Sequence, residues 1–208
     1  VRNYVTKRMK GENKSQVNNA DLLSVMIEDK TAFNGNIEWM VDQLLDFFLA
    51  GTATVSLQSQ SIIHRASVNQ EQLAKLRKDI DASFKEDGTG IFEGMDYEKI
   101  MEMEYFSWYM QEAIRICPPA PLSSTFVMKR DATINGIEFK AGDSMQPNIW
   151  AIQHNPEQWQ RPEEFIPERF DTDNKISLTP GGKKRDVGSY MPFLQGKRSC
   201  FGKTYAEI

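Results

Sequence analysis

The sequence predicts a mainly α-helical protein with a small β-sheet. Apolar residues recur at helical spacing from 37 to about 64, which indicates a long central helix. A second helical pattern runs from about 96 to 116 and stops at Pro118-Pro119, because proline cannot continue a helix. Beyond this helix the apolar residues no longer recur at helical spacing. The turn residues Asn135-Gly136 inside 133–139 predict short strands on either side of a turn.

Polar residues mark the expected starts of several helices. Asp21 is a candidate N-cap for a helix to residue 28, Asn36 for the long helix, and Asn69 for a shorter helix after it. The segment of about 156–192 is rich in proline, charge and aromatic residues and is expected to be an extended meander that leads into the loop 193–202. We expect 1–208 to be a single, incomplete domain.

Composition limits the possible functions. The 208 residues are 40% hydrophobic, enough for one sizeable core, and the net charge of −4 gives no general attraction to nucleic acid. Two cysteines, Cys117 and Cys200, argue against a disulfide framework. Without CxxC or HxxxH spacing, a zinc site made of protein ligands alone is not expected. No apolar stretch reaches the ~20 residues that a bilayer-spanning helix needs.

Cys200 lies in a loop with the pattern FxxGxRxCxG, whose fixed positions are Phe193, Gly196, Arg198, Cys200 and Gly202. Glycine lets a backbone pass close to a flat cofactor, and nearby positive charge favours a thiolate. A thiolate ligand of haem iron favours O–O cleavage. On spacing alone, a structural cysteine and a metal-ligating one remain equally open.

Two further patterns precede this loop. Glu112 and Arg115 form ExxR on the predicted helix before the double proline, and Arg169 lies in a PERF sequence downstream. In isolation the first pair would be a surface ion pair, but the helix around it is apolar and buried charges need partners. In this order, the three patterns resemble the cytochrome P-450 family of haem-thiolate monooxygenases, in its eukaryotic, microsomal form. The fold implied is the carboxyl-terminal part of the cytochrome P-450 fold, with Glu112, Arg115 and Arg169 as a structural network.

The resemblance implies a cofactor, partners and a location. The cofactor is haem b (iron protoporphyrin IX), with Cys200 as axial iron ligand, Arg198 beside a propionate, and Phe193, Gly196 and Gly202 around them. The activity implied is an oxidoreductase that inserts one atom of O2 into a small apolar organic substrate, with electrons from NADPH through a reductase. The expected location is the cytosolic face of the endoplasmic reticulum membrane, with an anchor upstream of Val1, and the fragment alone is expected to be inactive.

The segment from Ala50 to Thr54 is similar to the family's oxygen-activating segment. Ala50 and Gly51 are expected beside the haem, and glycine in a helix interior, which costs about 1 kcal/mol relative to alanine, predicts close packing on the backbone. Thr54 is the candidate catalytic residue for proton delivery, although a helix threonine also commonly bonds its own backbone. Ala53 stands where the family has an acid. This departure leaves open a peroxide isomerase or peroxygenase.

A second departure is Phe126, at a position where the family often has an arginine that pairs with a haem propionate. It leaves open a haem-less, non-enzymatic fragment. Gln153 and His154 are either further propionate contacts or exposed loop residues. Five basic residues surround the cysteine loop in sequence and form either a solvated face or a docking surface for an acidic electron donor: Lys183, Lys184, Arg185, Lys197 and Lys203.

Overall fold

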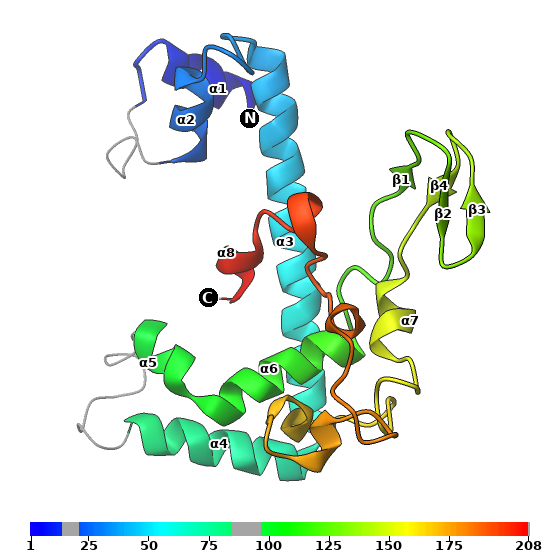
Figure 1. Ribbon diagram of the computed structural model, residues 1–208. Helices are drawn as coiled ribbons and strands as arrows, with labels where there is room; N and C mark the ends of the chain where they lie inside the picture. The colour runs from blue at the N-terminus through cyan, green and yellow to red at the C-terminus, as the bar shows by residue number, and fades with distance from the viewer. Residues whose placement is uncertain (14–20, 85–96, 208) are drawn as a thin grey trace. The chain divides into compact units, whose positions relative to one another are not determined.

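The computed structural model describes residues 1–13, 21–84 and 97–207. The chain divides into two compact units, residues 1–54 and residues 55–208 (Figure 1). Each unit has its own buried apolar cluster. We therefore describe the two units separately.

The first unit packs two short helices against the beginning of a long one. These are α1 (Arg2–Met9), α2 (Leu22–Glu28) and the first part of α3 (Ile37–Val68). The predicted caps are confirmed, since the carboxylate of Asp21 accepts from Ser24 N at 2.8 Å and the amide oxygen of Asn36 accepts from Trp39 N at 3.1 Å. The core of this unit consists of Val5, Leu23, Met26, Met40 and Val41.

Helix α3 has 32 residues and extends four residues beyond the predicted end at 64. By length and composition it could cross a bilayer, contrary to the expectation from the sequence, because isolated polar residues interrupt its apolar run without making it strongly charged. Core helices of soluble proteins meet the same criterion. Asn69 also differs from its prediction. Because α3 runs up to Val68, the Asn69 side chain donates to the Arg65 carbonyl at 2.9 Å instead of capping the next helix.

Three helices form the core of the second unit: α4 (Gln70–Phe84), α5 (Tyr97–Glu102) and α6 (Glu104–Ile116). The prediction of one helix over 96–116 is wrong, because Met103 is extended (φ −74°, ψ 101°) and separates α5 from α6. The carboxylate of Asp79 on α4 accepts from Phe106 N, in the first turn of α6, at 2.9 Å. This cap comes from another helix, so the local sequence could not reveal it.

The β-structure consists of two antiparallel pairs rather than one sheet. Strand β1 (Phe126–Val127) pairs with β4 (Ser144–Met145), and β2 (Ala132–Ile134) pairs with β3 (Ile137–Phe139). The predicted turn between β2 and β3 is confirmed. Asn135 and Gly136 have φ of +49° and +81°, the left-handed values that a tight two-residue hairpin turn needs.

After the short helix α7 (Ile149–Gln153), the chain follows an irregular path to residue 192. Its regular parts are single 3-10 turns, η1 (Pro167–Phe170), η2 (Lys175–Ser177) and η3 (Val187–Ser189). The turn η4 (Gly196–Arg198) and the helix α8 (Lys203–Glu207) follow. Figure 1 shows η1 against α6. The core beside them combines Leu76 of α4, Phe165 from the meander just before η1, and three residues of α6, which are Tyr109, Ala113 and Ile116. Tyr109 and Phe165 meet edge to face, with ring centroids 4.9 Å apart.

Candidate functional site

A buried carboxylate between two guanidinium groups joins α6 to the meander. Glu112, Arg115 and Arg169 are each 0% exposed. Arg115 Nε and Nη2 donate to the two carboxylate oxygens of Glu112 at 2.7 and 2.9 Å, and Arg169 Nε donates to Glu112 Oε1 at 3.1 Å. Ile166 N donates to the same oxygen at 2.9 Å. The structure thus brings together the three residues that the sequence singled out as a network.

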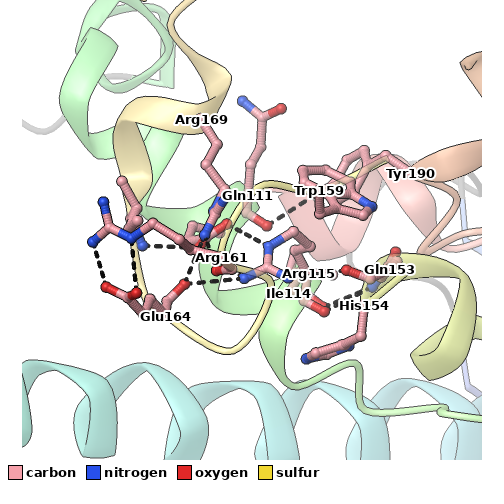
Figure 2. Close-up of polar contacts among 12 residues, drawn as sticks. Gln111, Ile114, Arg115, Gln153, His154, Trp159, Arg161, Glu164, Arg169 and Tyr190 are labelled. Atoms are coloured by element: carbon pink, nitrogen blue, oxygen red, sulfur yellow. Dashed lines mark hydrogen bonds and ion pairs between the residues drawn. The ribbon is translucent and has the colours of Figure 1, made fainter. Parts of the chain in front are cut away.

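Backbone carbonyls accept further hydrogen bonds from both guanidinium groups (Figure 2). Arg115 donates to the carbonyl of Gln153 at 2.9 Å and to that of Glu164 at 3.2 Å. Arg169 donates to the carbonyls of Gln160, Arg161 and Glu164. Burial lowers the pKa of the Arg169 guanidinium and the charge of Glu112 opposes that shift, so the cation persists inside the protein because it is paired.

Gln153 and His154 belong to this cluster and not to an exposed loop, which corrects one sequence interpretation. Gln153 is 0% exposed and donates to the carbonyls of Ile114 and Arg115, at the end of α6, at 3.2 and 3.0 Å. His154 is buried; its ring stacks on Trp150 at 4.4 Å, and its Nδ1 lies 2.8 Å from the Trp150 carbonyl. Burial lowers the pKa of His154.

Trp159 belongs to none of the patterns found in the sequence, yet it is 0% exposed and contacts two arginines. The guanidinium carbons of Arg115 and Arg185 lie 5.1 and 4.1 Å from its ring centroid, and its Nε1 donates to the Ser189 carbonyl at 3.3 Å. The interpretation of Arg185 as one of the surface charges is wrong. Burial, followed by the nearby charge of Arg169, lowers the pKa of Arg185 to about 10.

Cys200 lies on a tight turn of the second unit. Its backbone N–H donates to the Phe193 carbonyl at 2.7 Å, and Leu194 and Gly196 within the turn have φ of +58° and +74°. Cys200 is a free, exposed thiol, and Arg198 is exposed two residues before it. The turn therefore presents a thiol and a cation on the same short segment.

The proposed oxygen-activating residues lie on α3, in the first unit. Thr54 Oγ1 donates to the Ala50 carbonyl at 2.6 Å, which is the backbone bond that a helix threonine commonly makes. Ala50 and Ala53 are exposed. Among the described residues, no heavy atom lies within 4 Å of the position that a Cβ on Gly51 would take. Within the described part of the first unit, no other segment makes the close packing expected on Gly51.

Comparisons with known proteins decide the family. The model of the family described as Cytochrome P450 matches residues 1–208. The chain belongs to the cytochrome P450 family. The chain is 29% identical over 204 residues to Cytochrome P450 3A40 of Oryzias latipes, which covers 95% of this chain and 38% of that protein. Cytochrome P450 3A27 of Oncorhynchus mykiss is 32% identical over 169 residues, or 81% of this chain and 30% of the relative.

A solved structure, the crystal structure of a Cytochrome P450 (CYP102L1), matches with a TM-score of 0.80 and 26% identity. It covers 99% of this chain and 46% of that one. The predicted fold class is thereby confirmed: the chain is mainly helical with small antiparallel sheets and has the cytochrome P450 fold. The chain spans about two fifths of the length of the curated relatives it matches.

Membership in the cytochrome P450 family implies a haem cofactor, and the Cys200 turn fits one. A Cβ on Gly196 would meet no described heavy atom within 4 Å, and one on Gly202 would lie 4.0 Å from Cys200 Sγ, so both glycines leave room beside the thiol. Arg198 makes no hydrogen bond or ion pair with another described residue, which leaves its guanidinium available to a carboxylate. Within the described ranges no cluster of three acidic, histidine or cysteine side chains could hold a metal instead.

We predict that Glu112→Gln lowers the free energy of unfolding by about 3–5 kcal/mol, because it leaves two buried guanidinium groups without a counter-charge. Chemical denaturation followed by far-UV circular dichroism measures this loss. Glu164→Gln is the matched control, since that carboxylate is exposed and pairs only with Arg161 at the surface. The control substitution should lower the free energy of unfolding by less than about 1 kcal/mol. Equal effects of the two substitutions would contradict the role of the buried cluster.

Proposed function

We propose that this chain provides the haem-thiolate site of a cytochrome P450 monooxygenase. The observation that carries the proposal is the exposed Cys200 thiol on a glycine turn beside the free cation of Arg198. When bound, haem b supplies the activation of O2 for insertion of one oxygen atom into a small apolar organic substrate, with electrons from NADPH. The 208 residues alone are not expected to complete the pocket, since they span about two fifths of the curated relatives' length.

Each residue of the turn has its own proposed role in binding the haem. Cys200 Sγ is the proposed axial ligand of the iron, and Arg198 the proposed partner of a propionate. Gly196 and Gly202 keep Cβ atoms away from the cofactor plane. Phe193 is half-buried and holds the Cys200 amide through its carbonyl, which limits the positions that the thiol can adopt. Ala50 and Gly51 are the proposed contacts from α3, where small residues leave space.

Thr54 is the proposed proton donor. Its hydroxyl proton points to the Ala50 carbonyl, so delivery needs rotation about χ1, which in a helix gives threonine two favoured positions. Ala53 supplies no carboxylate to return a proton to Thr54 Oγ1. Proton delivery then depends on water, which favours slow turnover and release of hydrogen peroxide.

Ala53 also favours a second candidate function, a haem-thiolate peroxide isomerase or peroxygenase. A peroxygenase takes its oxygen atom from a peroxide, whose remainder leaves as water or an alcohol, whereas an isomerase rearranges the peroxide and keeps both oxygen atoms in the product. Neither enzyme needs a proton relay at Thr54 or external electrons. Phe126 favours a third candidate, a haem-less interaction protein, because one expected propionate partner is missing.

The proposed electron donor is an NADPH-dependent reductase that docks on basic residues around the cysteine turn. Lys183, Lys184, Lys197 and Lys203 are exposed and complement an acidic partner. By resemblance to microsomal members of the family, the proposed location is the cytosolic face of the endoplasmic reticulum membrane.

The decisive experiment is the carbon-monoxide difference spectrum of the reduced complete protein. We expect a thiolate-type Soret band in the wild type and its loss in Cys200→Ser, because serine cannot supply the thiolate. Cys117→Ser is the matched control, since Cys117 is also a free, exposed thiol, and should keep the band. A wild-type protein that binds no haem would contradict the enzyme hypothesis and support the non-enzymatic one.

The amount of hydrogen peroxide released distinguishes a monooxygenase from a peroxide-dependent haem enzyme. With reductase, NADPH and an apolar substrate that perturbs the Soret band, we expect Ala53→Asp to lower hydrogen peroxide released per NADPH consumed by about tenfold, since a positioned acid typically contributes a factor of 10² or more. Thr54→Ala should raise that ratio. Turnover with peroxide but none with NADPH and reductase, in the wild type and in Ala53→Asp alike, would instead establish the peroxide-dependent enzyme.

Neutralising Lys183 and Lys184 together by alanine is expected to weaken reductase binding several-fold at low salt, because complementary charges speed encounter. The difference should vanish at high ionic strength, where exposed charges are screened. Titration of the NADPH oxidation rate against reductase concentration gives the apparent affinity. Lys10→Ala with Lys30→Ala removes the same charge from exposed sites in the first unit; an equal loss there would show a net-charge effect and no docking site.

A further inference from the structure

Arg185 is a cation in the meander with no carboxylate partner among the described residues. Its guanidinium carbon lies 4.1 Å from the ring centroid of Trp159 and 5.9 Å from that of Phe170. Its Nη2 donates to the Arg169 carbonyl at 2.8 Å and its Nη1 to the Ile176 carbonyl at 3.5 Å. Aromatic faces and carbonyl oxygens thus replace the missing acid.

The two preceding basic residues behave differently. Lys183 and Lys184 are exposed on a small turn in which Thr179 N donates to the Lys183 carbonyl at 2.8 Å and Gly182 has φ of +73°. Only Arg185 of this basic run points inward onto Trp159. A planar guanidinium can stack on a ring and donate to a carbonyl at once, whereas an ammonium group cannot stack.

Trp159 connects Arg185 to the buried cluster and to the next segment of chain. Its ring also contacts Arg115, and its Nε1 donates to the Ser189 carbonyl at 3.3 Å. Tyr190 packs against Trp159 with centroids 6.3 Å apart and donates from its hydroxyl to the Gln111 carbonyl of α6 at 3.2 Å. The segment after Arg185 is therefore bound to Trp159 through Ser189 and to α6 through Tyr190.

The same segment leads to the cysteine turn through further hydrogen bonds. Gln158 Nε2 donates to the Asp186 carboxylate at 2.9 Å, and Asp186 N donates to Gln158 Oε1 at 2.9 Å. Gln195 Nε2 donates to the Val187 carbonyl at 3.2 Å, and Gln195 lies within the turn that the Cys200 amide closes onto the Phe193 carbonyl at 2.7 Å. Hydrogen bonds thus hold the chain at several points between Arg185 and Cys200.

We propose that Arg185 is a positioning residue for the Cys200 thiol. By stacking on Trp159 and holding the Arg169 carbonyl, it fixes 186–195 and so gives the cysteine turn a single position. This inference rests on the proposed haem-thiolate function. It assigns to one residue of the basic run a role distinct from partner docking, because its half-buried side chain stacks on Trp159 while Lys183 and Lys184 are exposed.

The test compares the complete wild-type protein with Arg185→Ala, Arg185→Lys and the control Arg130→Ala, which removes an exposed arginine. The first readout is the share of haem with a thiolate-type band in the reduced carbon-monoxide spectrum. The second is hydrogen exchange of the haem-free protein, residue by residue. We expect both Arg185 variants to lose thiolate-type haem and to exchange the amides of 186–200 at least about tenfold faster, with α6 unchanged, because local opening can be independent of global unfolding.

Each outcome decides the inference. Faster exchange confined to 186–200, with no rescue by lysine, supports the positioning role. Wild-type spectra and exchange in Arg185→Ala overturn it, and so does uniformly faster exchange that includes α6, which would make Arg185 a general stability residue. A wild-type protein without a thiolate-type band would remove the proposed function, while the exchange readout would still decide whether Arg185 holds the turn.

Discussion

The structure of the second unit depends on one buried carboxylate. Glu112 sits at 0% exposure between Arg115 of its own helix and Arg169 of the meander. A buried charge without partners costs several kcal/mol, so the meander must lie where Arg169 reaches Glu112 and its neighbouring carbonyls surround both guanidinium groups. An irregular segment with little secondary structure thereby acquires a fixed path over α6.

The residues that fix this path are different from those proposed to carry out the chemistry. The buried cluster contributes no reacting group; it holds the chain from which Trp159, Arg185 and then the Cys200 turn follow in order. The thiol itself is exposed, on a loop with positive φ values and open glycine positions, which the proposed function assigns to the approach of a cofactor. Reactive groups on loops held by a rigid support are a general feature of binding sites.

The sequence predicted the features that local chemistry determines. Asp21 and Asn36 cap their own helices, and Asn135-Gly136 turns its own hairpin, so their patterns sufficed. It did not predict features that depend on distant partners. Met103 breaks a helix because Asp79, from another helix, caps the next one, and Arg185 is held by Trp159, 26 positions earlier, instead of facing solvent like its lysine neighbours. Motif order identified Cys200 and Glu112, but spacing cannot reveal which further residues pack around them.

The most direct test of this account is a double-mutant cycle between Glu112 and Arg169. The free energy of unfolding would be measured for the wild type, Glu112→Gln, Arg169→Gln and the double variant. We expect a coupling energy of about 2 kcal/mol or more, which is toward the upper end of the range measured for residues that share one network. Additive effects, with a coupling energy near zero, would contradict the claim that this ion pair determines the path of the meander.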